Sequence, residues 1–423
     1  MLNYNRNDAS KRKVVISGMG TISSIGLSLE EVSSSLETGK CGISLLEERK
    51  KMGFRSGLSG VIKNFKPAFP LDRRYRKTLP DFGIWAWEAI CQALQQAELQ
   101  QDYIANSERA GFIFGNDSSV VTGVDQCHIL QNSENTRDIG SGHIFRLLTS
   151  TITLNISTKL QIRGASWTVS GACASGAMSI GQGAELIKSG SHDLVICGGA
   201  QEISWQSMCS FDALGAFSIK EKHPHLSSRP FDSQRDGLIP SGGAAAIILE
   251  SEESARKRGA KILAEVCGYG TTSDGNHLSV PTGEGLERAM KNALDDAAIQ
   301  PAEVDLVMAH ATSTPAGDEK EAEALCRLFS IRRNGEGPYV AATKSLTGHE
   351  FWMAGASQVV YGLIMSKNGF IAGHPNFEKG SDHSALLKIA PQTVPFSPRF
   401  ILCNAAGFGG VNAALVIRVN HAF

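Results

Sequence analysis

The chain has 423 residues, of which 42% are hydrophobic and 20% are charged, and its formal net charge is −1. This length predicts two domains or one duplicated α/β unit, and the near-zero charge excludes a global preference for nucleic acid or anionic membranes. No apolar stretch approaches the ~20 residues of a membrane span. The nine cysteines never form a CxxC pair, so we expect a cytoplasmic protein without a disulfide framework or zinc ribbon.

Apolar runs typical of buried strands alternate with amphipathic helical runs along the whole chain. The expected strands lie at 13–20, 109–117, 193–200 and 242–250, and the clearest helices at 75–97 and 283–299. This alternation predicts an α/β architecture.

Two segments about 250 residues apart resemble each other. VVISGMGTISS (14–24) and AEVCGYGTTSD (264–274) both read as a strand, a Gly-x-Gly pair and a Thr/Ser run. The echo favours a duplicated pair of half-domains, although chance similarity between short glycine-rich turns is an alternative. Neither pair has the third glycine of GxGxxG, and the chain has no GxxxxGK[ST] or GxSxG, so these nucleotide-loop and hydrolase motifs give no support.

Cys173 lies in TVSGACASGAMSI (168–180), where a β-rich run turns into a small-residue helix. We expect it in the first turn of that helix, where free N–H groups and the helix dipole lower a thiol pKa from its usual value of about 8.5. The small neighbours Ala172, Ala174, Ser175 and Gly176 leave room for a substrate. A buried structural thiol is the alternative, and this segment alone does not decide between them.

Two histidines occur in threonine- and glycine-rich loops. His349 ends the segment KSLTGH, which begins with Lys344, at the expected start of a helix. His310 directly follows a predicted strand at 304–309 and precedes Thr312, Thr314, Gly317, Asp318 and Glu321. One histidine at a strand end is often only a polar cap, but two such loops favour one site assembled around a nucleophile.

A glycine-rich segment precedes the last predicted strand. Gly407, Gly409 and Gly410 flank Phe408 in CNAAGFGGVNAALVIRV. This arrangement lets backbone N–H groups face a cavity, with an ordinary turn as the alternative. No HExxH motif or Cys/His cluster in the sequence indicates a metal site.

Together, these four segments resemble the thiolase-fold condensing enzymes, specifically the β-ketoacyl-acyl carrier protein synthases I and II. The family pattern is a cysteine in a small-residue turn, then HGT(G/S)TxxGDxxE, KSxxGH and NxFGFGGxN. This chain has GACASGA, HATSTPAGDEKE, KSLTGH and NAAGFGGVN in that order. The resemblance runs nearly end to end and is closer to synthase I.

The resemblance implies an α/β fold, a thiolase-like duplicated αβαβα five-layered sandwich with mixed sheets. The N-terminal half, 1–258, would hold Cys173 and inserted docking and dimer segments. The C-terminal half, 259–423, would hold His310, Lys344, His349 and the glycine-rich gate loop.

The same resemblance implies a 3-oxoacyl-[acyl carrier protein] synthase, an acyltransferase. Cys173 would carry an acyl chain as a thioester, and its N–H and that of Phe408 would form the oxyanion hole. His310 and His349 would promote decarboxylation of malonyl-carrier protein, whose carbanion attacks the acyl group and lengthens it by two carbons. The other implied site residues are Lys344 with Glu321 and Asp318 in electrostatic support, Thr312 and Thr314 on the pantetheine arm, and Ala406, Gly407, Phe408 and Gly409 at the acyl gate.

The implied partner is an acidic acyl carrier protein, and the segment LDRRYRKTL matches the family's docking helix. It supplies the basic residues Arg73, Arg74, Arg76 and Lys77, for which a solvated helix face is the alternative. We expect a homodimer, with a heterodimer containing a related ketosynthase-like subunit as the alternative. No metal or resident cofactor is expected, because the phosphopantetheine arrives on the carrier protein.

The chain departs from the family pattern at several positions. Ala311 replaces the glycine of HGT, and Ala405 and Ala406 replace the usual Ser-Phe before GFGG. After His349, EFWMAG places Glu350–Met353 where side chains are usually small, and Gln358 stands where glutamate is common. These differences concern the substrate range, and they favour a specialised polyene or polyketide pathway slightly over bulk fatty acid synthesis.

Two other functions deserve comparison. A catalytically silent, chain-length-factor-like partner would shape a neighbour's cavity, but retention of Cys173, His310, Lys344 and His349 opposes that reading. A thiolase would need a second catalytic cysteine, and Cys403 lacks its CxG context.

Overall fold

The computed structural model describes residues 12–420, and its main feature is a ten-stranded mixed sheet in the order β10-β9-β13-β14-β8-β1-β7-β6-β4-β5. Two small sheets pair β2 with β3 and β11 with β12. The strands are β1 (Val14–Ile22), β2 (Ile43–Leu45), β3 (Leu58–Gly60), β4 (Ala110–Gly115), β5 (Ser166–Val169), β6 (Leu194–Gln201), β7 (Gly243–Ser251), β8 (Ala264–Ser273), β9 (Leu306–Met308), β10 (Tyr339–Ala341), β11 (Phe370–Ile371), β12 (Val394–Pro395), β13 (Phe400–Gly407) and β14 (Val411–Val419).

The two halves of the sheet have the same pattern of strand directions. In one half, β5, β4 and β6 are parallel, and β7 and β1 each run antiparallel to the strand before them. In the other half, β10, β9 and β13 are parallel, and β14 and β8 each run antiparallel to the strand before them. A short antiparallel pairing of β1 with β8, at Val15↔Glu265 and Ile16↔Ala264, joins the halves.

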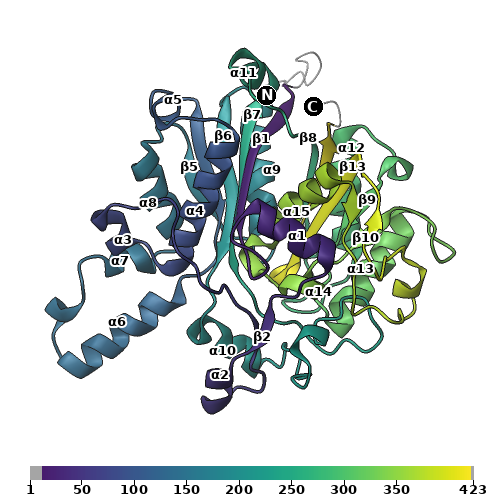
Figure 1. The fold of residues 1–423 in the computed structure, drawn as a ribbon, viewed down its shortest axis with the longest axis horizontal. Coiled ribbons are helices and arrows are strands. Elements are labelled where there is room, and N and C mark those ends of the chain that lie inside the picture. Colours follow the sequence, from purple (N-terminus) through teal and green to yellow (C-terminus); the bar gives the residue numbers. More distant parts are fainter. Residues whose placement is uncertain (1–11, 421–423) are drawn as a thin grey trace.

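Helices form three layers around the sheet halves (Figure 1). Helix α4 packs on β1 and β7, α12 packs on β8 and β14, and α9 and α15 lie in the centre. Helix α15 is buried around its whole circumference from Ala354 to Ser366, as expected for a central helix. The helices are α1 (Leu29–Thr38), α2 (Glu47–Lys51), α3 (Arg73–Thr78), α4 (Asp81–Gln96), α5 (Gln101–Ala105), α6 (Val120–Ser133), α7 (His143–Leu147), α8 (Thr151–Leu160), α9 (Ser175–Lys188), α10 (Trp205–Ala213), α11 (Glu252–Lys257), α12 (Glu284–Ala297), α13 (Pro315–Leu328), α14 (Lys344–Thr347) and α15 (Ala354–Asn368).

The repeated Gly-x-Gly pairs have the same structural role in both halves. A Cβ at Gly18 or Gly20 of β1 would strike carbonyl oxygens of α4, and a Cβ at Gly268 or Gly270 of β8 would strike carbonyl oxygens of α12. The glycines therefore let each outer helix lie directly on its strand.

The sequence predicts most of these elements correctly, with one clear error. The four expected strands correspond to β1, β4, β6 and β7, and helix 283–299 corresponds to α12. The helix predicted over 75–97 is instead two helices, α3 and α4, separated by extended Leu79 and Pro80. Proline has no N–H and pushes the residue before it out of the helical region, so the periodic pattern continues through a break.

Within residues 12–420, every helix is either too short or too polar to span a bilayer. The division of the chain at 258/259 remains a prediction.

Candidate active site

A sharp turn presents Cys173 between β5 and α9. Ala172 has a left-handed backbone with φ of 48°, and the Ser175 hydroxyl accepts the Gly171 N–H at 2.9 Å and donates to the Ala172 carbonyl at 2.6 Å. Helix α9 starts only at Ser175. The prediction that Cys173 lies in the first helical turn is therefore wrong, because the left-handed residue delays the helix.

His349 is held by its backbone as well as by its ring. Its N–H donates to the Ile239 carbonyl at 2.7 Å, and its carbonyl accepts the Ser241 N–H at 2.8 Å. The ring stacks on Phe351, with centroids 4.6 Å apart and an interplanar angle of 24°. These contacts fix the imidazole at the start of the central layer.

The Glu321 carboxylate of α13 holds the loop that carries His310. It accepts the backbone N–H groups of His310 at 2.8 Å and Ala311 at 2.6 Å, and the side-chain amide of Asn404 at 2.7 Å. Burial raises the pKa of Glu321 to about 7. Glu321 therefore positions His310 through the backbone.

Asp318 organises the loop that follows in a similar way. Its carboxylate accepts the backbone N–H groups of Thr312 at 3.0 Å, Thr314 at 3.2 Å and Ser313 at 3.1 Å. The hydroxyls of Thr312 and Thr314 lie 3.1 Å apart, and burial raises the pKa of Asp318 to about 6.

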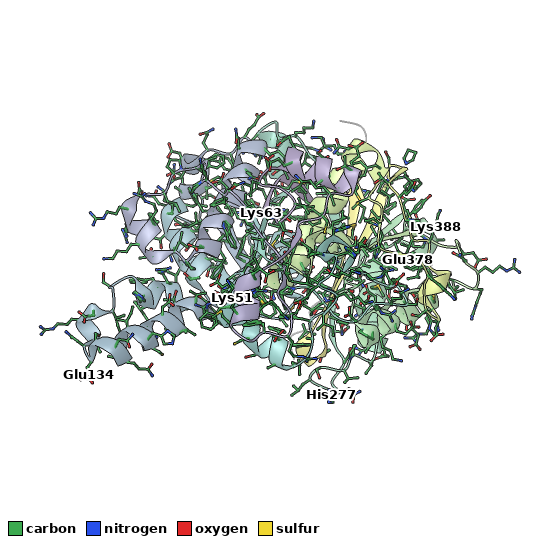
Figure 2. All side chains as sticks on the ribbon, turned by 60° about the horizontal axis from the view of Figure 1, so that its bottom comes forward. Lys51, Lys63, Glu134, His277, Glu378 and Lys388 are labelled. Atoms are coloured by element: carbon green, nitrogen blue, oxygen red, sulfur yellow. The ribbon has the colours of Figure 1, made fainter. Side chains whose placement is uncertain are left out.

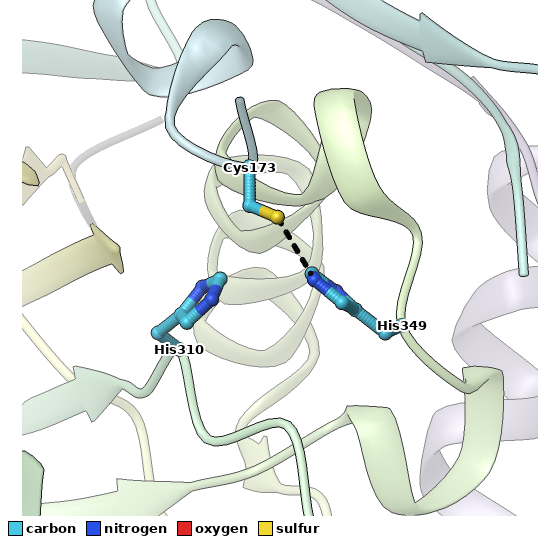
Figure 3. Close-up of side chains that lie close together, drawn as sticks. All are labelled: Cys173, His310 and His349. Atoms are coloured by element: carbon cyan, nitrogen blue, oxygen red, sulfur yellow. Dashed lines mark hydrogen bonds between the residues drawn. The ribbon is translucent and has the colours of Figure 1, made fainter. Parts of the chain in front are cut away.

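Three of the four predicted catalytic side chains, Cys173, His310 and His349, meet at one point (Figure 3), while the fourth, Lys344, lies apart from them. His349 Nε2 lies 3.1 Å from Cys173 Sγ, and the rings of His310 and His349 stand edge to face with centroids 5.2 Å apart. The Cys173 sulfur and one ring nitrogen from each of the two histidines all lie within 4.8 Å of one another. This spacing would also accommodate a thiophilic ion such as Zn²⁺.

Burial dominates the electrostatics of the site. It raises the pKa of the Cys173 thiol to about 12, while the charge of Lys344 acts in the opposite direction. The thiol pKa is therefore raised, not lowered as the helix end predicts, because desolvation disfavours the thiolate. Burial and Lys344 also lower the pKa of both histidines well below the usual value, so both rings are neutral and His349 can accept the thiol proton.

Lys344 lies buried at the start of α14. The expected pairing with Glu321 is not a direct one, because in the described part of the chain Lys344 makes no ion pair within 4.0 Å. Burial lowers the pKa of Lys344, and the charges of Glu321 and Glu350 oppose this effect through space.

A cavity of about 320 Å³ leads to Cys173. Phe408, at the predicted gate, is 44% exposed, and residues of the loop at 274–283 also line the cavity. Figure 2 shows His277 of this loop at the outer edge of the molecule. Gly409 does not line the cavity but donates its N–H to the Leu278 carbonyl at 2.7 Å. The predicted site residues that do line it are Cys173, His310, His349, Thr312, Thr314, Asp318, Glu321, Ala406, Gly407 and Phe408.

An aromatic wall, formed by Phe211, Phe351 and Trp352, lies beside Cys173. Phe211 contacts Phe351, with centroids 4.9 Å apart, and stacks under Phe408 at 5.8 Å. The Trp352 indole N–H donates to the Ser118 hydroxyl at 3.2 Å. A Cβ at Gly176 or Gly199 would lie at 3.0 or 2.7 Å from the Trp352 carbonyl oxygen, so these glycines of α9 and β6 let the backbone of the segment after His349 pack closely against them.

Sequence reasoning missed two features near the thiol. Asp117 is half-buried and acts on Cys173 electrostatically, and Phe211 links the gate to the wall. Asp117 is the last residue of the predicted strand 109–117, which contains β4 and is parallel to β5, the strand that leads to Cys173; this placement could have marked it.

The remaining predicted residues lie elsewhere. Helix α3 presents its basic residues to solvent, namely Arg73, Arg74, Arg76 and Lys77. Cys403 is buried in β13, where desolvation raises its pKa, and it is absent from the lining of the cavity. The structure therefore offers no second catalytic cysteine of the thiolase kind at Cys403.

Comparison with known proteins decides the family. Residues 11–255 match the "Beta-ketoacyl synthase, N-terminal domain" and residues 263–378 the "Beta-ketoacyl synthase, C-terminal domain". The chain belongs to the β-ketoacyl synthase family. It is a condensing acyltransferase of the synthase I kind, with the cysteine–histidine–histidine site in place.

Relatives of this β-ketoacyl synthase match along nearly its whole length. The 3-oxoacyl-[acyl-carrier-protein] synthase 1 of Haemophilus influenzae is 37% identical over 410 residues, which cover 96% of this chain and 99% of the relative. The crystal structure of a β-ketoacyl synthase from Burkholderia phymatum superposes with a TM-score of 0.90 at 30% identity, covering 97% and 100% of the two chains.

A third similarity concerns a polyketide enzyme. A type II polyketide ketosynthase, solved with its acyl carrier protein and bound to the hexaketide, matches with a TM-score of 0.86 at 27% identity, covering 97% of this chain and 100% of that one. These matches confirm the predicted family and the thiolase-like fold.

Proposed function

We propose that this synthase condenses malonyl-carrier protein with an acyl group held on Cys173, giving a 3-oxoacyl product two carbons longer. The observation that carries the proposal is the convergence of the Cys173 sulfur and two neutral imidazoles within 4.8 Å, at the end of a cavity lined by Thr312 and Phe408. A silent partner subunit would have no need for that convergence.

In the first half-reaction, Cys173 Sγ attacks the carbonyl carbon of an acyl-carrier protein thioester. His349 Nε2, at 3.1 Å, takes the thiol proton and returns it to the departing pantetheine thiolate. The oxyanion faces the N–H groups of Cys173 and Phe408. The segment that carries Phe408 lies close to Cys173, because a Cβ on the preceding residue, Gly407, would lie 3.2 Å from the Cys173 nitrogen.

In the second half-reaction, His310 and His349 donate Nε2–H bonds to the thioester oxygen of malonyl-carrier protein. The carbon–carbon bond to the carboxylate breaks and carbon dioxide leaves. The electron pair of the broken bond stays on the thioester fragment and forms an enolate. The carbanion attacks acyl-Cys173, a carbon–carbon bond forms, and the Cys173 thiolate leaves. The Thr312 and Thr314 hydroxyls, which line the cavity, would bind the pantetheine arm.

An acidic acyl carrier protein is the proposed macromolecular partner, and the exposed basic face of α3 is its proposed dock. Of the charged residues flanking this helix, Asp72 is already paired with Lys159 at 3.1 Å. Four cations on one short helix would steer an anionic partner.

A homodimer is the proposed assembly. Strand β5 is the last strand of the ten-stranded sheet, its residues Ser166 and Trp167 are exposed, and exposed apolar side chains follow α6, at Ile144, Phe145 and Leu148. An uncovered edge and apolar surface favour pairing with a second chain. A related ketosynthase-like subunit at the same edge is the alternative.

The test combines adduct detection with product analysis. The protein is incubated with acyl-carrier proteins of graded chain length and then with malonyl-carrier protein, and Cys173 acylation is measured by mass spectrometry. An acyl adduct and a 3-oxoacyl product, both lost in Cys173→Ala, support the proposal. No adduct with any acyl group, under conditions where a known synthase reacts, would overturn it.

A further inference from the structure

Arg235 is an arginine that the proposed reaction steps do not use, although it lies beside the site. Its side chain is only 6% exposed, and a few residues further along the same segment the Ile239 carbonyl accepts the His349 N–H. Burying a guanidinium is costly unless its N–H groups and its charge find partners. The partners of Arg235 therefore indicate its task.

The Arg235 guanidinium holds the start of α13. Its Nε donates to the Thr314 carbonyl at 3.1 Å, and its Nη2 donates to the Pro315 carbonyl at 2.8 Å. The remaining nitrogen, Nη1, donates to the Asp232 carbonyl at 2.8 Å and to the Ser381 hydroxyl at 3.0 Å. Because the guanidinium is planar and rigid, these contacts fix the start of α13 relative to two other segments.

The charge of Arg235 is compensated inside the protein. The guanidinium lies 3.8 Å from the Asp318 carboxylate and 3.6 Å from the Glu319 carboxylate. Glu319 also accepts the Ser381 hydroxyl at 2.9 Å, so the same side chains are joined a second time. The contacts of Arg235 thus serve to hold parts of the chain together and leave no free cation for an anionic ligand.

The backbone around Arg235 holds the same loop at Ser313. The Gly237 N–H donates to the Ser313 carbonyl at 3.0 Å, and the Arg229 N–H donates to the Ser313 hydroxyl at 2.9 Å. Ser313 is fully buried and has a left-handed backbone with φ of 71°. Such a conformation is costly for a residue other than glycine and persists only where its surroundings fix it. The segment at 229–237 therefore holds this loop in a strained shape.

This shape keeps two threonine hydroxyls at the cavity. Thr314 is the N-cap residue of α13, where a threonine side chain usually accepts an N–H of the first turn, yet its side chain makes no such hydrogen bond. Its hydroxyl lies 3.1 Å from that of Thr312, and both residues line the cavity. A Cβ at Gly317 would lie 2.5 Å from the Thr314 hydroxyl oxygen, so glycine leaves the hydroxyl its place.

We propose that Arg235 is a positioning residue: by fixing the carbonyls of Thr314 and Pro315, it keeps the Thr312 and Thr314 hydroxyls placed to bind the amides of the pantetheine arm. This inference rests on the proposed function, which brings that arm to Cys173. Arg235 itself contacts neither the arm nor the reacting atoms.

The experiment compares two acyl donors that carry the same acyl group. Acyl-pantetheine has the amides of the arm, whereas the S-ethyl thioester has none, and neither donor needs the carrier-protein dock. The rate constant for acylation of Cys173 by each donor is measured by mass spectrometry in wild type and in Arg235→Lys, which keeps the charge but loses the planar fork. We expect the rate constant for acyl-pantetheine to fall about tenfold and that for the ethyl thioester to stay unchanged. An equal loss with both donors, or no loss with either, would overturn the proposal.

A matched control is Arg258→Lys. Arg258 also donates to a backbone carbonyl, that of Ala97 at 2.7 Å, and to a carboxylate, that of Glu250 at 2.8 Å, but it does not line the cavity. Its substitution should leave the preference between the two donors unchanged. If Arg235→Lys fails to fold, Ser381→Ala removes one contact that fixes the guanidinium and should reduce the preference for acyl-pantetheine, and an unaltered preference there contradicts the proposal.

The two donors also separate this inference from the proposed function. If the wild-type protein is acylated on Cys173 by neither donor, the proposed function fails, and the positioning role fails with it. If the wild-type protein prefers acyl-pantetheine and Arg235→Lys retains that preference, only the role of Arg235 is refuted.

Discussion

The His349 ring places Nε2 3.1 Å from Cys173 Sγ, while its Nδ1 has no hydrogen-bond partner within residues 12–420. In a serine–histidine–aspartate triad, a carboxylate on Nδ1 fixes the tautomer. Here the ring is oriented by stacking on Phe351 and by its backbone. Either nitrogen can therefore carry the proton, which suits a residue proposed to accept a proton in one half-reaction and to donate a hydrogen bond in the next.

The reactivity of Cys173 should rise steadily with pH. Since burial raises the thiol pKa to about 12 and only the thiolate reacts, alkylation should increase from about pH 6 to about pH 10 without a plateau. Lys344→Met should slow the reaction about tenfold for each unit by which the thiol pKa rises further. Peptide mass spectrometry measures the rate, with exposed Cys209 as an internal reference. A plateau near neutral pH would show a thiolate stabilised more strongly than burial allows.

The aromatic wall should limit the acyl chain that Cys173 accepts. Phe351→Leu removes the ring that lies between His349 and Phe211 and opens space beside the sulfur, so kcat/KM should shift toward longer or bulkier acyl-carrier proteins by about tenfold or more. The measurement is a competition among acyl chains of graded length.

The matched control for this prediction is Phe217→Leu. Phe217 stacks on Phe211 at 6.4 Å but does not line the cavity. Both substitutions truncate a buried ring, so both should lower stability by a similar mechanism, loss of apolar contacts and creation of a cavity. An identical selectivity change in the two variants would mean that loosened packing, not the wall, sets the preference.

The proposed dock on α3 predicts a salt-dependent binding defect. Arg74→Glu with Arg76→Glu reverses two exposed charges, and KM for acyl-carrier protein should rise about tenfold at low ionic strength and less at high salt. Turnover of small acyl thioesters without the carrier protein should not change. Lys291→Glu on α12, where the native lysine pairs with Asp295, is the control. A similar rise in KM in that variant would assign the effect to net charge alone.

The sequence predicts the catalytic geometry well because its motifs carry local constraints. His310 follows β9, and Glu321 and Asp318 lie on the helix that comes next, so one short segment contains both the histidine and the carboxylates that hold its loop. The Gly-x-Gly echo likewise predicts duplication because close contact of strand and helix leaves no room for a side chain.

Electrostatics and long-range packing are less accessible from sequence. The pKa of Cys173 depends on burial created by residues from distant segments, including Phe351, Phe211 and Leu238, and a helix-end argument cannot include them. Pro80 marks the end of α3 in the sequence, but the apolar periodicity continues on both sides of it and predicts one continuous helix. The Ser23 hydroxyl, which donates to the Glu350 carboxylate, likewise lies 327 residues away in the chain.

The paired glycines make a final prediction about stability. Gly20→Ala and Gly270→Ala each place a Cβ against a carbonyl oxygen of the covering helix, at Ala89 of α4 and Ala289 of α12. Because backbone atoms cannot rotate away, each should cost about 1–3 kcal/mol or more, measured by urea unfolding. Gly123→Ala is the control, since its nearest neighbour is the flexible Leu147 side chain and alanine favours the α6 helix. Equal losses at the three positions would contradict a specific strand–helix contact, whereas matched losses at Gly20 and Gly270 alone would show that both halves of the fold depend on the same close packing.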